Sequence, residues 1–378
     1  MDRSRRWRNL GTAAGALAAS MYAAFDLYQW AVAFASDHFH NDFTFYVAAA
    51  RIGLDHGWSS IYDLTLQQAQ LDAMGSGITV AQLARYISPP PVAWIALPFT
   101  VVPYEAGYLI WSVLLLVALS ATWYLAAPGS GWPRAIHLVA ALAWVPVIYG
   151  LQLGQPGLFV ALGVAASYAL LRRGQELLAG LALGVLVLKP QLAFLVPIAL
   201  LVAGRYRAFA GAALVLGLLA IASAINVGPG GIATYQDRLN FAAGVPVNRE
   251  LTLAPLIGDL TLTRVAQALI ALWALALAFA LRKRGPEWIF VVALVGGLLA
   301  SPYLHLDDLV MLGLAMWIYL RVESRPPWTW AYVLALVIAA EGVPVWGPAP
   351  LLIGEVIALA LLAIVPVSSR GAAYSASM

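Results

Sequence analysis

The sequence predicts an all-α membrane protein, a polytopic bundle of about 12 transmembrane helices. Of the 378 residues, 62% are hydrophobic and only 10% are charged, a composition that a soluble domain of this size cannot keep in solution. Apolar runs recur from Leu10 to Val367 with no long polar linker between them. Residues 1–378 are therefore expected to form a single membrane domain, with lipid as the solvent for most of it.

Apolar runs of about 20 residues, or somewhat fewer, locate the expected spans. These runs lie near residues 10–35, 106–126, 135–150, 157–171, 176–188, 190–203, 207–226, 262–281, 287–301, 305–320, 328–345 and 349–367. The basic start resembles a signal peptide, but the run that follows is as long as a span, so we expect it to be retained. Lys189-Pro190 interrupts two short runs, which could instead be half-helices that meet at a re-entrant point.

Basic residues in the connecting loops predict the orientation of the bundle. They are Arg3 to Arg8, Arg134, Arg172, Arg173, Arg205, Arg207, Arg282 to Arg284, Arg321, Arg325 and Arg370. In this span map they all lie on one side, which the positive-inside rule assigns to the cytoplasm. We therefore expect both termini to be cytoplasmic, at a membrane of the bacterial inner-membrane type. Because topology accounts for these charges, nucleic acid is not an expected partner.

Residues 36–105 are the longest segment on the opposite, outer side. Aromatic residues such as Trp58 and Trp94 lie among polar ones there, a pattern typical of helices that lie in the membrane interface. Residues 89–102 are apolar but too short and Pro-rich for a clean span, so they should re-enter the membrane or lie flat. The expected architecture is a helical bundle with a structured outer cap.

Polar residues 37–46 directly follow the first expected span. A carboxylate such as Asp42 would be only partly solvated there, which raises its pKa and its strength as a base toward a hydroxyl. Alternatively, this segment is a solvated loop that ends a helix. His38 and His40 lack the third fixed ligand of a zinc site, whereas Asp37 with Asp42 leaves open a divalent cation.

A second polar group, residues 301–308, begins a late span and places His305, Asp307 and Asp308 at membrane depth. Ionisable residues are costly there and are usually functional. His305 and Asp308 are three residues apart, so a carboxylate could orient the imidazole. Alternatively, one of the two acids caps the start of the helix.

Lys189 lies between two apolar runs, where an unpaired ammonium is costly and a phosphate would compensate it; alternatively, it snorkels to the headgroups. Arg85 and Arg238 are further cations on the outer side, either for phosphate or as simple surface charges. Residues 154–157 form a tight turn in which the amide of Gln155 could bind hydroxyls. The chain has no cysteine, which excludes thiol chemistry, and it has no Walker, dinucleotide, HExxH or GxSxG motif.

These segments together resemble glycosyltransferase family 87, whose members are membrane enzymes of the GT-C class. The resemblance covers nearly the whole chain, and the order and spacing of its short segments carry it. The segments are Asn41 to Arg51 with Ile61-Tyr62-Asp63, Ser88 to Pro91 with Leu97-Pro98, Gly154 to Gly157, Gly180 to Gly184, Leu188 to Gln191, and Ser301 to Asp308.

The resemblance implies transfer of a sugar, typically mannose, from a polyprenyl-phosphate donor to a glycolipid or glycan acceptor at the outer face. It implies that Asp42 is the general base, with His305 as a second catalytic candidate. The expected ligands are Lys189, Arg85 and Arg238 for the donor phosphate and Tyr46, Gln155, Gln191, Tyr303, Asp307 and Asp308 for the substrates. No cofactor is implied with certainty, and a divalent metal is left open.

A single base and a single leaving group predict direct displacement with inversion at the sugar carbon. Two other classes of protein fit parts of the pattern. A secondary transporter or a flippase for lipid-linked sugars would also carry intramembrane ionisable residues and broken helices, although no inverted repeat is visible. A non-catalytic subunit of an envelope-assembly complex is the third alternative.

Overall fold

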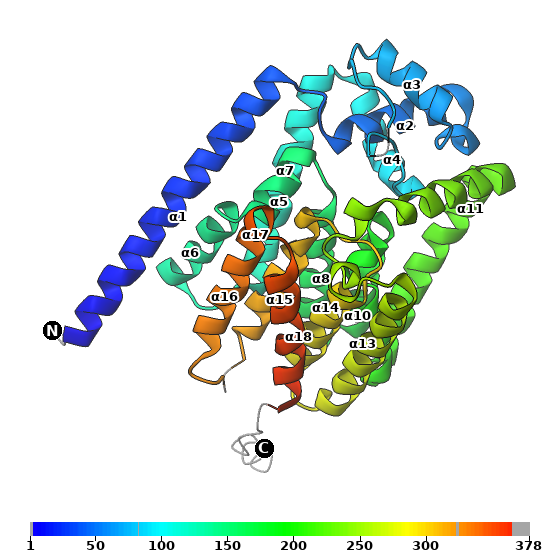
Figure 1. The fold of residues 1–378 in the computed structure, drawn as a ribbon. Helices are drawn as coiled ribbons and strands as arrows, with labels where there is room; N and C mark the ends of the chain where they lie inside the picture. The colour runs from blue at the N-terminus through cyan, green and yellow to red at the C-terminus, as the bar shows by residue number, and fades with distance from the viewer. Residues whose placement is uncertain (1–2, 82, 323–324, 365–378) are drawn as a thin grey trace.

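The computed structural model describes residues 3–81, 83–322 and 325–364, and every element of regular secondary structure in these ranges is a helix (Figure 1). The α-helices are α1 (Arg3–Ser36), α2 (Asp42–His56), α3 (Leu64–Ala73), α4 (Pro90–Ala96), α5 (Tyr104–Ala126), α6 (Gly131–Leu142), α7 (Val145–Leu153), α8 (Gly157–Arg172), α9 (Glu176–Ala182), α10 (Leu195–Val202), α11 (Tyr206–Gly244), α12 (Ala254–Ile257), α13 (Leu260–Leu281), α14 (Pro286–Ala300), α15 (Val310–Tyr319), α16 (Thr329–Glu341), α17 (Val343–Trp346) and α18 (Ala349–Ile364). The short 3-10 helices are η1 (Trp58–Ser60), η2 (Leu97–Val101), η3 (Leu183–Leu188), η4 (Pro190–Leu192), η5 (Pro246–Arg249) and η6 (Leu306–Leu309).

Three helices in the described part of the chain, α5, α11 and α13, are long and apolar enough to cross a membrane. The pair α6 and α7, bent by 58°, would make a fourth span. Several further apolar helices, including α8, α14, α16 and α18, have 10 to 17 residues. The protein is thus a helical integral membrane protein, as the composition predicts, while the number of about 12 spans stays a prediction.

Two breaks in the helices decide where polar groups are placed. η3 ends at Leu188 and η4 begins at Pro190, so Lys189 lies between two short helical segments, the arrangement expected of half-helices. In α11 the chain turns at Gly228, whose φ of 69° favours glycine, and Pro229 follows it. The expected span ended at residue 226, but the chain continues as a helix after this kink to Gly244.

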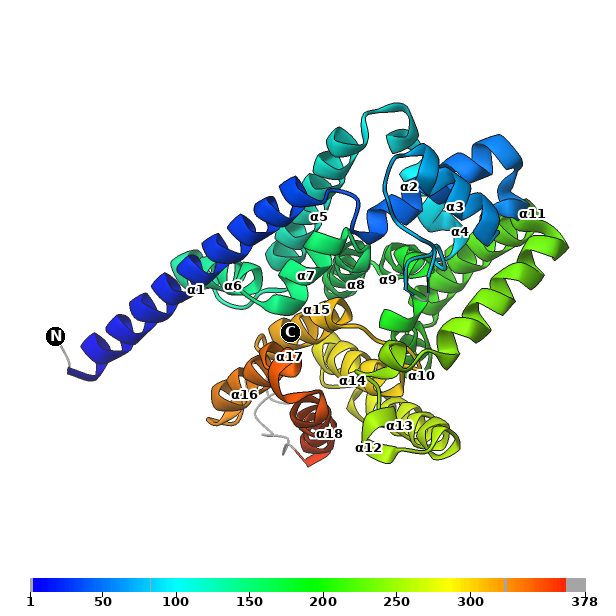
Figure 2. The same ribbon diagram turned by 45° about the horizontal axis from the view of Figure 1, so that its top comes forward.

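A cap made of residues 42–101, comprising α2, η1, α3, α4 and η2, lies at one end of the bundle (Figures 1 and 2). The second half of α11 packs against this cap, because Gly231 lies against the backbone of Ser59. Helix α1 extends away from the bundle toward its N-terminus (Figure 1). Near its other end, the indole N–H of Trp30 donates a hydrogen bond of 2.7 Å to the hydroxyl of Tyr108 on α5. The cap occupies the segment expected to form interfacial helices.

Several of the loop arginines gather at the end of α5 that is remote from the cap. The guanidinium of Arg134 lies over the ring of Trp123, Arg321 donates to the carbonyl of Ala127 at 3.2 Å, and Arg172 pairs with Glu287 at 3.2 Å. The opposite end of α5 meets the cap through Tyr104 and Thr44. These arginines therefore share one end, as predicted. Arg370 and residues 365–367 of the last expected span lie outside the described residues.

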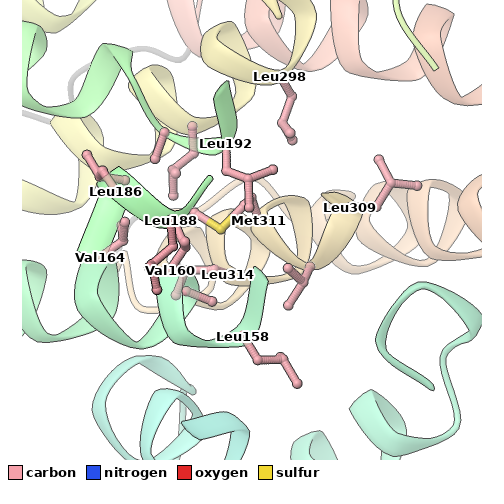
Figure 3. Close-up of a cluster of buried hydrophobic side chains, with 14 of the residues drawn as sticks. Leu158, Val160, Val164, Leu186, Leu188, Leu192, Leu298, Leu309, Met311 and Leu314 are labelled. Atoms are coloured by element: carbon pink, nitrogen blue, oxygen red, sulfur yellow. The ribbon is translucent and has the colours of Figure 1, made fainter. Parts of the chain in front are cut away.

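A cluster of buried aliphatic side chains supports the segments that carry the polar residues (Figure 3). Its labelled members are Leu158, Val160, Val164, Leu186, Leu188, Leu192, Leu298, Leu309, Met311 and Leu314. They come from α8, α14, α15 and the short helices η3, η4 and η6. Leu188 and Leu192 flank Lys189, and Leu309 follows Asp308, so packing of their neighbours holds both charged groups in place.

Replacing Gly180 by alanine should destabilise the crossing of α9 and α11. A Cβ atom at this position would overlap the carbonyl oxygen of Ala208, and close helix contacts in membranes depend on such small residues. We expect a loss of about 1–3 kcal/mol, measured as a lower thermal unfolding midpoint in detergent. Gly217→Ala is the matched control, since a Cβ there meets no atom within 4 Å; equal midpoints for both variants would contradict the prediction.

Candidate active site

Four segments far apart in the sequence meet at the cap end of the bundle. Asp42 and Tyr46 come from the start of α2, Gln155 from the turn between α7 and α8, and Lys189 from the break between η3 and η4. The loop 301–308 before α15 supplies the remaining groups. Hydrogen bonds connect Gln155 to α2 and Lys189 to this loop.

Asp42 is the first residue of α2, because Asn41 caps this helix. The side-chain oxygen of Asn41 accepts a hydrogen bond of 3.2 Å from the backbone N–H of Thr44. Tyr46 lies one turn further along, on the same face as Asp42. The amide of Gln155 donates to a carboxylate oxygen of Asp42, and its own oxygen accepts from the hydroxyl of Tyr46 at 3.3 Å. Gln155 thereby binds both residues of that face.

The environment of Asp42 favours its protonated form. Burial raises the pKa of Asp42 to about 7, and the negative charge of Asp307 adds to this rise. The ammonium of Lys189 and the hydrogen bond from Gln155 act in the opposite direction. A carboxylate whose pKa lies near neutrality is well matched to general-base catalysis at that pH.

The turn that carries Gln155 depends on a glycine. Gly154 ends α7 in the left-handed region, with φ of 68°, a conformation that other residues adopt at a cost. A Cβ atom there would also lie 3.0 Å from the Cβ of Phe43. The carbonyl of Gly154 accepts a hydrogen bond of 2.8 Å from the indole of Trp111 on α5. The turn therefore places Gln155 directly beside α2.

Lys189 is buried and pairs with two carboxylates. Its Nζ lies 2.7 Å from Oδ2 of Asp307 and 2.5 Å from Oδ1 of Asp308, and the two acids are 3% and 0% exposed. Although burial opposes its charge, the two acids raise the pKa of Lys189 above its usual value. An ammonium has three N–H bonds, so one remains to bind a third acceptor.

The imidazole of His305 is oriented by a tyrosine, which differs from the sequence prediction. Nε2 of His305 lies 2.9 Å from the hydroxyl of Tyr303. Asp308, expected to orient the ring, instead accepts the backbone N–H of His305 at 2.9 Å, as the capping alternative predicts. The second carboxylate oxygen is close enough to the backbone because the chain begins η6 here. Burial lowers the pKa of His305, which favours the neutral ring at pH 7.

Arg85 and Arg238 lie near each other, although 153 positions separate them in the sequence. Burial and the neighbouring charge of Arg238 lower the pKa of Arg85, whose guanidinium lies 4.3 Å from the ring centroid of Phe241. Among the described residues, no hydrogen bond joins either arginine to Asp42 or Lys189. Gln191, two positions after Lys189, makes no side-chain hydrogen bond within the same residues.

Each of the two histidines considered for metal binding lies beside one carboxylate. His40 lies 2.8 Å from Asp37, and His38 lies 3.4 Å from Glu105. Across residues 3–81, 83–322 and 325–364, no group of three or more His, Asp or Glu side chains is arranged to hold a metal ion.

The sequence analysis did not identify Tyr149, which the structure places near both Asp42 and Asp307. It also missed the chain of rings that leads away from Tyr46. Tyr86 lies 6.4 Å from Tyr46, Tyr62 lies 5.5 Å from Tyr86, and Tyr235 of α11 stacks on Tyr62 at 4.5 Å between centroids. Tyrosines in an aromatic-rich cap gave no distinguishing signal, because their pairing depends on how α11 folds back over the cap.

Residues 86–302 match the sequence model of glycosyltransferase family 87, which is more than half of the chain. The chain belongs to this family. The family consists of membrane glycosyltransferases, so the protein is a glycosyltransferase of the membrane. Gln155, Lys189 and Arg238 lie within the matched range, whereas Asp42 and the loop 303–308 lie outside it. No curated protein and no solved structure matches the chain.

Replacing Lys189 by methionine should strongly destabilise the family 87 protein. The change leaves Asp307 and Asp308 buried without their cation, which costs about 3–5 kcal/mol. The penalty should grow with pH: burial then raises both folded-state pKa values above the unfolded ones, so the acids are tolerated when protonated and stability falls as they ionise. The measurement is detergent-solubilised unfolding at pH 5 and pH 8.

The other lysine, Lys283, is exposed, so Lys283→Met serves as the matched control and should leave stability nearly unchanged. A penalty for Lys189→Met that is small at both pH values would show that the ion cluster is dispensable for folding.

Proposed function

We propose that the protein transfers a sugar, mannose as the first candidate, from a polyprenyl-phosphate donor to a glycolipid or glycan acceptor on the non-cytoplasmic face. The observation that carries this proposal is the carboxylate of Asp42, which is partly buried, has a pKa of about 7 and binds Gln155. It lies at the end of the bundle opposite Arg134, Arg172 and Arg321, which the positive-inside rule assigns to the cytoplasm.

In the proposed reaction, Asp42 removes the proton of an acceptor hydroxyl. The acceptor oxygen then forms a bond with the anomeric carbon, while the bond between that carbon and the phosphate oxygen breaks. The lipid phosphate leaves with the bonding electron pair, and the proton stays on Asp42. Attack and departure on opposite faces invert the configuration of the anomeric carbon.

The surrounding residues divide into two groups around this step. Gln155, whose amide oxygen accepts from Tyr46, holds the base, and both side chains could bind sugar hydroxyls. Lys189 can direct its third N–H to the departing phosphate, where charge develops, and such preorganised donors are worth most in a water-excluded site. His305 with Tyr303 supplies a neutral hydrogen-bonding pair beside it, and Arg85 with Arg238 forms a second basic position for phosphate.

A lipid donor requires apolar surface near the site. An apolar groove lies between α5, α6, α7, α15 and α16. Its lining includes Trp144, which precedes α7, Val147 of α7, and Val310, which is two residues after Asp308. A second apolar pocket lies between α14, α15, α16 and α18.

The first test is transfer of radiolabelled mannose from polyprenyl-phosphate mannose to membrane glycolipids by purified protein. Asp42→Asn should abolish transfer, because the amide cannot accept the proton, and the variant should remain folded. Asp37→Asn is the matched control: Asp37 is exposed, and its partners in the described part of the chain are His40 and the backbone of Phe39, so transfer should persist. Transfer that survives in Asp42→Asn would exclude this residue as the base.

The pH dependence of transfer tests the environment of the base. The active form of Asp42 is the carboxylate, so kcat/KM should rise from acid pH and level off above about pH 7. Gln155→Leu removes a hydrogen bond that lowers this pKa, so it should move the acidic limb to higher pH as well as lower kcat. A limb near pH 4, the usual range of an aspartate, would contradict the proposed burial of the base.

A further inference from the structure

Helix α7 begins with a backbone donor that neither the helix nor its N-cap residue satisfies. Trp144 precedes the helix and provides no side-chain cap, while its carbonyl already accepts from Val147 and Ile148. Pro146 has no N–H to donate. The remaining donor of the first turn is the N–H of Val145, and an unpaired donor of this kind is costly in an apolar environment.

Glu341, at the last position of α16, satisfies this donor from 196 positions away in the sequence. Its Oε2 accepts the hydrogen bond from Val145 N at a distance of 3.0 Å. The indole of Trp144 donates in turn to the carbonyl of Val337 on α16, at 3.4 Å. Helix α16 therefore holds the start of α7 at two points, and the negative side chain lies at the positive end of the α7 dipole.

The other end of α7 carries the group that binds the base. After nine residues the helix ends at Gly154, and the next residue, Gln155, donates to Asp42. Along its length α7 also packs on η6, where Gly150 leaves room for the Cβ of Asp307. A short helix that is fixed at its start transmits its position directly to the turn at its end, because a helix of this length has little room to bend.

We infer that Glu341 is a positioning residue, which caps α7 and thereby fixes Gln155 against Asp42. The inference rests on the proposed function of Asp42 as the base. Glu341 does not touch the reacting groups in this arrangement, and its role is to keep the carboxylate of Asp42 in one orientation. The carboxylate of Asp42 keeps one orientation only if the amide of Gln155, which binds it, is itself fixed in position.

The charged groups around the two ends of α7 can be named. Asp26 of α1 lies close to Glu341, and its Oδ2 has no hydrogen-bond partner among the described residues. At the other end Asp42 faces Asp307 and Lys189. Within the described residues, Glu341 accepts a hydrogen bond from the backbone of α7 and Asp26 does not, which distinguishes the expected effect of Glu341 from that of Asp26.

The test compares Glu341→Ala with Glu341→Gln in the full-length protein in lipid nanodiscs. Glutamine keeps an oxygen that can accept from Val145, whereas alanine removes it. Two readouts are taken: kcat and donor KM with polyprenyl-phosphate mannose, and the titration of the Asp42 carboxyl band by infrared difference spectroscopy against Asp42→Asn. The second readout needs no turnover.

Glu341→Ala should lower kcat by about ten- to a hundred-fold with little change in donor KM, since a small misplacement of a reacting group has effects of this size. It should also move the Asp42 titration to higher pH, because the hydrogen bond from Gln155 is weakened. Glu341→Gln should restore both values. The control Asp26→Asn should leave both unchanged.

A double-mutant cycle separates positioning from general loss of structure. If Glu341 acts through Gln155, Glu341→Ala should cause no further loss of kcat in a Gln155→Leu background. Full additivity, or a Glu341→Gln variant as impaired as Glu341→Ala, would overturn the inference. If Glu341→Ala does not fold, Glu341→Asp, whose shorter side chain draws back from Val145, should show the same shifts in milder form.

Failure of the proposed function would look different. Wild-type protein that transfers no sugar would overturn the enzymatic proposal, while the infrared titrations of wild type, Glu341→Ala, Glu341→Gln and Asp26→Asn would still decide whether Glu341 controls the environment of Asp42. An Asp42 titration that is identical in wild type and Glu341→Ala would overturn the inference whatever the activity.

Discussion

The pairing of Lys189 with Asp307 and Asp308 is the constraint on which the rest of the site depends. An ammonium in an apolar bundle must be compensated, so the break between η3 and η4 has to meet the loop that precedes α15. Leucines on both sides of the lysine are buried in the same core as Leu309. Apolar packing and charge compensation therefore require the same arrangement of these segments, and this agreement makes the position well defined.

The cluster of Lys189, Asp307 and Asp308 contributes to a catalytic site because helix α7 connects it to Asp42. This helix packs on η6 of the Asp307 loop, and the turn after it brings Gln155 to Asp42 of the cap. Burial of Asp42 beside Asp307 then raises its pKa. At Asp42, burial raises the pKa more than Lys189 and Gln155 lower it. At Asp307, the charge and hydrogen bond of Lys189 outweigh burial and lower the pKa.

The sequence predicted the membrane bundle and several of the residues that meet in the site, but it did not predict the contacts between them. The polar segments around Asp42, Gln155, Lys189 and residues 301–308 were recognisable because ionisable groups are rare in so apolar a chain. The hydrogen-bond partner of each side chain could not be predicted from the sequence. Asp308 accepts the backbone N–H of His305, and the hydroxyl of Tyr303 bonds to the imidazole of the same residue. Such choices depend on differences of about an ångström between segments that are distant in sequence.

In the proposed reaction, charge moves across the site instead of accumulating in it. Asp42 begins as a carboxylate and ends protonated, while the donor phosphodiester becomes a lipid phosphate with one more negative charge. Protonation of Asp42 removes the repulsion between its carboxylate and Asp307, which contributes to the raised pKa of Asp42. The lipid phosphate can accept the third N–H of Lys189, whose other two N–H groups are taken by Asp307 and Asp308. Such contacts are strong in a medium of low dielectric constant, so the base and the leaving group are each matched to one part of the same ion cluster.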